Sequence, residues 1–326
     1  MAKVILHVGL PKTATTTIQK HLLYNLHKKN KINYLGKLIS KDSRGDSIHV
    51  LSESYQIRSY IDGSTEEKPN LHYLLREELI NVISDEGILC FYPGKFNLSI
   101  KDKLLRIKDL FKDHDLKIVI SLRESSDYIQ SLYFQLYPEY YVFDTELNTF
   151  SKFKEHLLKA DKYILHEYFD IGYVVKCLEE NFSIDILFYE DLKYGNSDFY
   201  IGLNNAFEIE GSLEYLTGKS ENVQSKLGGK VRKKIGFDEL VSYLVRKINN
   251  SSVIYVFLKY IYRMFVFMNL DKVLPRININ NIDSATVSEL QEIRIITQIQ
   301  NKTICDAFPN YKSKLESYNY IESTTN

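Results

Sequence analysis

The sequence is poor in the residues that carry disulfide, metal and redox chemistry. Its 326 residues include no tryptophan, three methionines and three cysteines. The cysteines, Cys90, Cys177 and Cys305, lie far apart, and none stands in a Cys-x-x-Cys pair. This spacing indicates neither a disulfide framework nor a zinc site, and it suits a chain that works in the reducing cytoplasm.

The chain also lacks an excess of charge of either sign. Lysine plus arginine and aspartate plus glutamate each number 42. Without a basic field, nucleic acid is not expected as the main partner, so any site for an anion must be local. Hydrophobic residues make up 44% and charged residues 26% of the chain, which is ordinary for a globular protein.

The N-terminus has no stretch that resembles a secretion leader. The apolar run Val4–Val8 is too short for the hydrophobic part of a signal peptide, and no small-residue cleavage site follows it. We expect an α/β core at residues 1–245 and a helical extension at residues 246–326 that packs on it. Within the core, the polar stretch at about residues 36–70 is expected to be a mobile covering segment.

Short apolar runs with a β-bias alternate with helical patterns along the first two thirds of the sequence. The runs are Lys3–Val8, Gly87–Tyr92, Lys117–Leu122 and Ile184–Tyr189, and Thr15–Lys28 has the periodicity of a helix. Apolar strands separated by helices are typical of a parallel sheet that is covered on both faces. The sequence therefore predicts a three-layer α/β/α fold with a central, mainly parallel sheet.

A lysine and a run of hydroxyl side chains occupy the turn between the first strand and the first helix. The first N–H groups of a helix lack intrahelical partners and carry partial positive charge, so with a lysine beside them they suit a phosphate or sulfate. A plainer interpretation is that the threonines cap the helix and the lysine is solvated. The residues of this turn are Pro11, Lys12, Thr13, Ala14, Thr15, Thr16 and Thr17.

The turn is not a Walker A sequence, because Pro11 stands where that motif has the glycine before its lysine. Instead, His7–Thr16 resembles the 5′-phosphosulfate loop of sulfotransferases that use 3′-phosphoadenosine 5′-phosphosulfate (PAPS). Ala14 stands where the family prefers glycine. If that position needs a positive φ, alanine adds strain of about 1 kcal/mol. The resemblance implies a P-loop NTPase-like α/β fold, with PAPS as the sulfuryl donor held by residues 11–17.

Two further segments resemble motifs of the same family, in the family's order. Arg123 at a strand end and Ser131 eight residues on match its 3′-phosphate motif, although Ser125 stands where the family often has proline. Tyr189 opens a Tyr-Glu-Asp-Leu segment like the one whose tyrosine lies near the adenine. The resemblance spans about residues 4–192 and implies that Arg123, Ser131 and Tyr189 bind the nucleotide. Taken singly, Arg123 and Ser131 also suit an unliganded surface, and Tyr189 suits a core aromatic.

The resemblance also implies the roles of residues in transfer. Lys12 and the N–H groups of Thr13–Thr16 are expected to stabilise the departing phosphate, while Arg123 and Ser131 hold the remote 3′-phosphate. No metal is expected, because sulfate carries less charge than phosphate and the sequence has no carboxylate cluster with metal-ligand spacing.

A general base must remove the proton of the acceptor, and in this family it is a histidine or a glutamate. His49 is our candidate, because it lies in the polar stretch after the first helix, where bacterial members often carry a histidine. Glu53 on the same segment is the reserve. His72, on an expected helix, and His7, in the first strand, are less favoured.

Two segments of the C-terminal third carry weaker signals. Residues 226–234 hold five cations and no acid, which suits closure over PAPS, contact with an anionic acceptor or a solvated helix face. Residues 253–270 are apolar and aromatic apart from Lys259, Arg263 and Asn269. This pattern suits a buried helix, and it also suits a helix that lies at a membrane surface.

Together these observations favour a PAPS-dependent sulfotransferase that acts on a hydroxyl or amine, with a carbohydrate or glycan as the favoured acceptor and a small molecule next. We expect it in the cytoplasm, with contact to the inner face of the membrane as an alternative through residues 253–270. Two other functions stay open. One is a non-catalytic module that binds the nucleotide or an anionic glycan, and the other is a kinase with a divergent phosphate loop.

Overall fold

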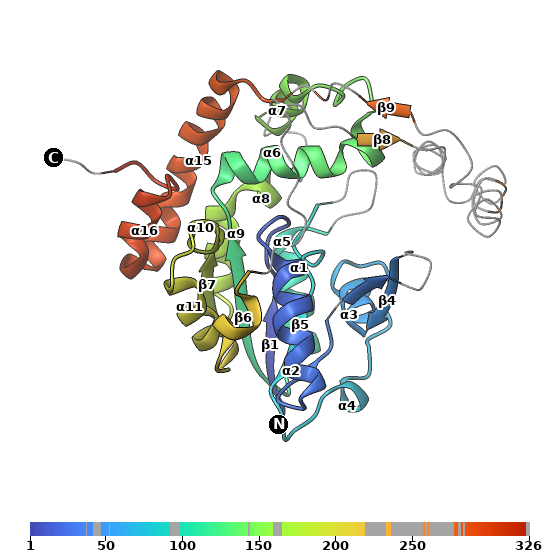
Figure 1. Ribbon diagram of the computed structural model, residues 1–326. Coiled ribbons are helices and arrows are strands. Elements are labelled where there is room, and N and C mark those ends of the chain that lie inside the picture. Colours follow the sequence, from blue (N-terminus) through green and yellow to red (C-terminus); the bar gives the residue numbers. More distant parts are fainter. Residues whose placement is uncertain are drawn as a thin grey trace.

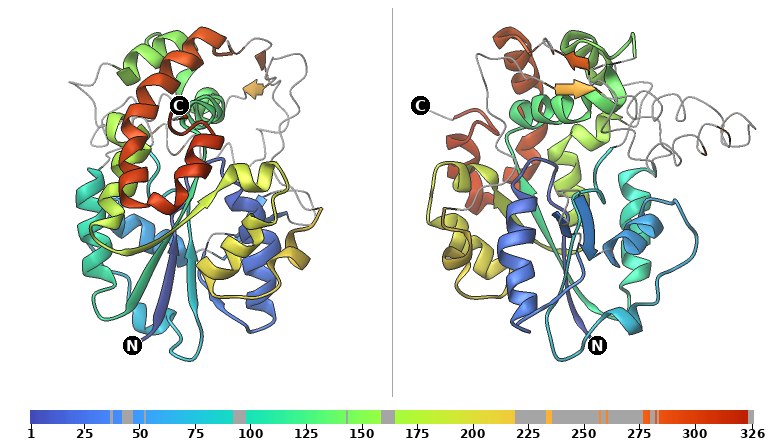
Figure 2. Two further views of the ribbon diagram at one scale, coloured as in Figure 1. Left: turned by 90° about the vertical axis from the view of Figure 1, so that its left-hand side faces the viewer. Right: turned by 45° about the vertical axis from the view of Figure 1, so that its right-hand side comes forward.

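The structure is a computed structural model. It describes residues 1–36, 38–41, 47–51, 53–91, 98–142, 144–158, 165–218, 233–235, 257, 260, 277–279, 282 and 284–323. Among these residues, five parallel strands form a central sheet in the order β2-β5-β1-β6-β7. Helices cover both of its faces, so the predicted three-layer α/β class is confirmed (Figures 1 and 2).

The elements follow one another along the chain in an alternation of strands and helices. The strands are β1 Lys3–His7, β2 Asn33–Tyr34, β3 Leu38–Lys41, β4 Ser47–Leu51, β5 Asn81–Ser84, β6 Asp115–Leu122, β7 Ser183–Phe188, β8 Lys233–Ile235 and β9 Ile277–Ile279. The helices of the first half are α1 Thr15–Thr17, η1 Ile18–Leu23, α2 Tyr24–Lys28, α3 Glu53–Ile61, α4 Leu71–Leu74, α5 Ile100–Leu110, α6 Ser125–Leu136 and η2 Tyr137–Tyr141. Those of the second half are α7 Phe150–Leu158, α8 Leu165–Phe169, α9 Ile171–Glu179, α10 Tyr189–Lys193, α11 Asp198–Phe207, α12 Ser212–Leu216, α15 Val287–Ala307, η4 Pro309–Tyr311 and α16 Lys312–Ser317.

The two faces of the sheet bury separate hydrophobic clusters because side chains alternate along each strand. On the central strand β1, Val4 and Leu6 belong to the cluster that includes α5, α6, α9 and α15. Ile5, between them, belongs to the cluster under the helix that runs through α1, η1 and α2 and under α11 and α12. In Figure 2 the long blue helix that contains α1, η1 and α2 lies with the yellow helices on one face of the sheet, and the cyan and green helices lie on the other.

The predicted strand at Gly87–Tyr92 is wrong. Gly87–Cys90 form a turn, and the strand that pairs with β1 is β5, at Asn81–Ser84. The apolar run misled the prediction because Ile88, Leu89 and Cys90 are buried in the core although they form a turn. In contrast, the strands predicted at the positions of β1, β6 and β7 are confirmed.

The helix predicted at Thr15–Lys28 is present, with a π-helical stretch from Ile18 to Leu23. The stretch at residues 36–70 contains more regular structure than its composition suggests. It holds the antiparallel pair β3 and β4 and the helix α3. Its predicted role as a mobile cover stays a prediction.

The described part of the predicted helical extension contains the helices α15, η4 and α16, but also the strand β9, which pairs with β8. A capping box between Thr286 and Glu289 opens α15, which packs against α9 and α6. Within the described ranges, no helix is long and apolar enough to cross a membrane. The basic residues 226–232 lie outside the described residues, as do residues 253–270 apart from the exposed Phe257 and Tyr260.

Candidate functional site

The carboxyl ends of the parallel strands meet at one edge of the sheet, and chemistry-bearing residues gather there. The chain passes from β1 to β2 and β5 on one side, and then to β6 and β7 on the other side of β1. In open α/β sheets, ligands bind in the crevice that opens where the strand order reverses in this way. The loop after His7 and the residues that follow β5, β6 and β7 lie at this edge, which we call the crevice.

The loop after β1 folds back through two left-handed residues. Lys12 has φ 71° and Ala14 has φ 63°. Leu10 N donates a hydrogen bond to the carbonyl of Ser121 on β6 at 3.0 Å, and Thr13 Oγ1 donates to the carbonyl of Leu10 at 2.6 Å. Among the described residues, the N–H groups of Thr13, Ala14 and Thr15 have no acceptor. Successive N–H groups in such a turn form a concave site for an anion.

The position at which the family prefers glycine therefore has a positive φ, and Ala14 adopts that conformation. The left-handed region costs a residue with a Cβ atom about 1–2 kcal/mol. Glycine is instead required at Gly9, where a Cβ atom would lie 2.6 Å from Thr15 Cγ2 and 3.0 Å from His7 Nε2. The close approach of the loop to the strand below it depends on this glycine.

His7 supports the loop from below, and because it is buried it cannot contact an acceptor substrate. Its Nδ1 lies 2.9 Å from Ser84 Oγ on β5, and its Nε2 lies 2.8 Å from Ser121 Oγ on β6. The ring is fully buried, and burial lowers its pKa from 6.5 to about 3. Gln19, on the helix that follows the loop, also donates to Ser84 Oγ at 3.1 Å. His7 is thus a neutral structural residue, in line with its low rank among the candidate bases.

Arg123 follows β6 directly and reaches the loop after β1. Its Nη1 donates a hydrogen bond to the backbone carbonyl of Lys12 at 3.2 Å. Its guanidinium carbon lies 4.8 Å from the centre of the Tyr189 ring, which follows β7. Its Nε is buried and has no hydrogen-bond partner among the described residues. The structure therefore brings Lys12, Arg123 and Tyr189 to one place.

Ser131 lies on α6, one turn beyond Asp127 on the same side of the helix, and is partly buried. At the N-terminus of α6, the N–H groups of Ser126 and Asp127 already donate to the carboxylate of Glu124, at 3.1 and 3.0 Å. These two N–H groups are therefore occupied within the protein.

The electrostatic surroundings of Lys12 include an acid that the sequence analysis did not single out. The pKa of Lys12 is lowered by partial burial and by Arg123, while Glu86 acts to raise it. Glu86 follows β5 at the same edge of the sheet, is partly buried, and accepts a hydrogen bond from Gln19 Nε2 at 3.3 Å. Two acids directly after a strand, Asp85 and Glu86, could have indicated this site from the sequence. The sequence analysis missed them because it placed the strand at Gly87–Tyr92, after these acids, instead of at Asn81–Ser84.

The neighbouring acid, Asp85, makes structural contacts within the protein. It is buried, and its Oδ1 accepts from the N–H of Gly87 at 2.8 Å and lies 3.3 Å from Arg58 Nη1. Of the pair, Glu86 is therefore the carboxylate that faces the loop.

The predicted bases occupy different places. His49 lies in β4, opposite Ile39, and Glu53 begins α3, but their side chains lie outside the described residues. His72 is exposed on α4, whose Leu74 carbonyl accepts from Asn33 at the start of β2. His72 therefore lies at the amino edge of the sheet, away from the crevice (Figure 1).

The sequence has no match among family models or among curated proteins. Among solved structures, the chain is similar to a sulfotransferase from Alicyclobacillus acidocaldarius. The two are 14% identical, the match covers 68% of this chain and 87% of the other, and the TM-score is 0.38. A similarity of this size carries no information on reaction or substrate.

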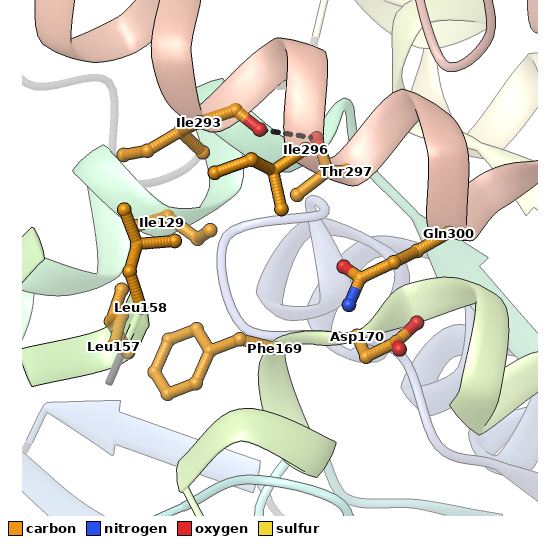
Figure 3. A pocket seen from close by; sticks show the side chains of 9 residues that line it. All are labelled: Ile129, Leu157, Leu158, Phe169, Asp170, Ile293, Ile296, Thr297 and Gln300. Carbon is orange, nitrogen blue, oxygen red and sulfur yellow. Dashed lines mark hydrogen bonds between the residues drawn. The ribbon is translucent and has the colours of Figure 1, made fainter. Parts of the chain in front are cut away.

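A separate hollow lies between α6, α7, α8 and α15 (Figure 3). Ile129, Leu157 and Phe169 on one side face Ile293 and Ile296 of α15 across it. None of the predicted site residues lines it, so we interpret it as a packing defect between helices. Across the part of the chain that the structure describes, no group of three metal-ligating side chains occurs.

Proposed function

We propose that the protein is a sulfotransferase that uses PAPS as its donor. One observation carries the proposal: Arg123 Nη1 donates to the Lys12 carbonyl at 3.2 Å, although the two residues are 111 positions apart in the sequence. The two motifs that resemble the sulfotransferase family thus belong to a single crevice. A nucleotide with phosphates at both ends of its ribose needs such a pair of neighbouring anion sites.

The residues of the crevice fit PAPS in charge and in hydrogen-bonding capacity. The loop that contains Lys12 offers an ammonium group and the N–H groups of Thr13, Ala14 and Thr15 to the 5′ end. Arg123, whose Nε is buried and has no partner within the described ranges, and Ser131 suit the 3′-phosphate. The partly exposed ring of Tyr189 suits the adenine. When bound, PAPS supplies a sulfuryl group on a phosphate leaving group.

Within this proposal, Lys12 and the loop N–H groups stabilise negative charge on the bridging oxygen as the bond to the sulfuryl group breaks. Their effect is large because the groups are fixed before the reaction and partly removed from water. Arg123 and Ser131 act at a distance, since binding the far phosphate fixes the position of the reacting end. His7 maintains the loop but takes no proton at ordinary pH, because its pKa is lowered to about 3.

Two residues are candidates for the general base. His49 is the candidate from the sequence. Glu86 is supported by its position beside Lys12, where its carboxylate can accept the acceptor's proton while Gln19 holds it through a hydrogen bond of 3.3 Å. We propose a carbohydrate or glycan hydroxyl or amine as the acceptor, and the cytoplasm as the site of action.

Isothermal titration calorimetry with 3′-phosphoadenosine 5′-phosphate (PAP), followed by turnover of PAPS with a panel of acceptors, tests the proposal. PAP binding at micromolar or tighter affinity, with ATP at least about tenfold weaker, is expected, together with sulfated product. Tight PAP binding without any turnover would favour a binding module. Preference for ATP with Mg²⁺ would favour a kinase and overturn the proposal.

A further inference from the structure

Two cations converge on one oxygen atom at the rim of the crevice. Arg123 Nη2 and Lys193 Nζ each lie 3.6 Å from Oδ2 of Asp127. The two nitrogens are therefore no more than twice that distance apart. Both contacts are longer than a hydrogen bond, and the Asp127 and Lys193 side chains are 37% and 41% exposed. Ion pairs of this kind contribute little to stability, so Asp127 is weakly held where it lies.

Arg123 has hydrogen-bonding capacity that Asp127 does not use. Its Nη1 donates to the Lys12 carbonyl, while its Nε is buried without a partner among the described residues. The Nε and Nη2 atoms share one edge of the planar guanidinium, and this edge suits two oxygens of one phosphate. The contact with Asp127 is a single long approach to Nη2, so the edge is not saturated.

Lys193 is carried by an element that is anchored firmly. It ends α10, which begins with Tyr189 beneath the Arg123 guanidinium. Between these residues, Glu190 Oε2 accepts a hydrogen bond from the Tyr320 hydroxyl at 3.0 Å, and Asp191 Oδ2 accepts from Lys314 Nζ at 2.9 Å. Glu190 Oε1 also accepts from the N–H of Glu124, next to Arg123, at 2.9 Å, so the turn that presents Lys193 is held beside Arg123 before any ligand arrives.

We infer that Arg123 and Lys193 form a two-cation clamp for the 3′-phosphate of the nucleotide, and that Asp127 is an internal anion which this phosphate displaces. The inference rests on the proposed function and adds to it a residue, Lys193, and a source of specificity. A phosphate dianion bridges the two cations better than one carboxylate oxygen does, because it offers several acceptors at once. A nucleotide without the 3′-phosphate leaves Asp127 in place and gains nothing from Lys193.

Calorimetry with PAP and with adenosine 5′-monophosphate, which lacks the 3′-phosphate, tests the inference. Lys193→Gln should weaken PAP about tenfold and leave the monophosphate unchanged, as expected for one charge-assisted contact. Lys193→Arg should retain most of the preference for PAP. Asp127→Asn should strengthen PAP severalfold, because the phosphate no longer competes with a carboxylate. Lys176→Gln, an exposed lysine paired with Glu180 on α9, is the matched control.

The outcomes separate the inference from the proposed function. If the unmodified protein binds PAP no better than the monophosphate, the proposed function itself fails. If it prefers PAP, but Lys193→Gln keeps that preference, the clamp is overturned while the function stands. Thermal unfolding of each variant identifies any loss of fold. The ion pairs of Lys193 and Asp127 are partly exposed and therefore weak. We expect the Lys193→Gln and Asp127→Asn variants to unfold within a few degrees of the parent.

Discussion

His7 Nε2 on β1 lies 2.8 Å from Ser121 Oγ on β6, two residues beyond Val119, the register partner of His7, where the chain enters the loop after β1. The other ring nitrogen faces Ser84 Oγ on β5 at 2.9 Å. A neutral imidazole thus joins the three central strands at the point where the loop leaves the sheet. Charging that ring removes an acceptor and places a cation in a buried site, so the loop depends on pH.

We predict that acid destabilises the protein through His7. Its folded pKa of about 3 lies below the ordinary value of 6.5, so the unfolded chain binds the proton more readily. The contribution of His7 to stability is complete above pH 6.5 and is lost as the pH falls towards 3. The slope from this single group approaches about 1.4 kcal/mol per pH unit. Urea unfolding between pH 7.5 and 4 measures it.

His7→Gln serves as the control for this prediction, because an amide keeps hydrogen-bonding capacity and does not titrate. The variant is expected to be less stable at pH 7.5 and to have a shallower pH dependence than the parent. Equal slopes for the two proteins would mean that other groups cause the acid sensitivity.

Ala14→Gly should stabilise the protein without harming nucleotide binding. Ala14 has φ 63°, which glycine adopts without strain. Relief of that strain is worth about 1 kcal/mol and is partly offset by the greater freedom of glycine in the unfolded chain. Chemical denaturation measures the gain. Ala206→Gly, inside α11, is the matched control and should cost about 1 kcal/mol; a loss at both positions would contradict the strain argument.

Lys12→Ala and Arg123→Ala should affect different steps. Removal of Lys12 is expected to lower kcat by about 100-fold or more with a small change in PAP affinity, because its charge acts on the departing phosphate. Removal of Arg123 is expected to weaken PAP by at least about tenfold. Turnover and calorimetry measure the two effects. Lys112→Ala, exposed at the amino edge of the sheet, should change neither.

The base is decided by Glu86→Gln and His49→Ala measured together. If Glu86 takes the proton, Glu86→Gln lowers kcat by about 100-fold while PAP binding changes little. Glu67→Gln, an exposed acid on the segment before α4, is the control. Normal turnover by Glu86→Gln with a large loss in His49→Ala would return the role to the histidine.

Lys314→Met should destabilise the fold and the α10 turn together. Lys314 Nζ and the Tyr318 hydroxyl donate to the buried Asp191 at 2.9 and 2.6 Å. Without the lysine, a buried carboxylate loses its cation, at a cost of about 2 kcal/mol. Urea unfolding measures the loss. Asp191→Asn in the same chain should recover part of it, and no recovery would show that packing, not charge, is responsible.

The sequence predicts the sheet and the loop after β1 because both depend on residues that are neighbours in the chain. Apolar runs form buried strands, and the Pro11–Thr17 turn itself contains the lysine and the hydroxyl side chains. Arg123 was predicted because its place after a strand and its spacing to Ser131 together resemble the sulfotransferase motif. The β5 strand was misplaced because its buried Asn81 and Ser84 are polar, while the turn after it is apolar. The position of Glu86 beside Lys12, and of Lys193 beside Asp127, depends on which strands are neighbours in the sheet. The sequence alone does not determine this strand order.

The hydrogen bond from Tyr320 to Glu190 joins residues 130 positions apart in the sequence. Glu190 Oε1 in turn accepts from the N–H of Glu124, next to Arg123. During translation, this hydrogen bond can form only after the chain has emerged beyond residue 320. A nascent chain that already contains all five strands of the central sheet therefore still lacks the contact that ties α10 to the C-terminal segment.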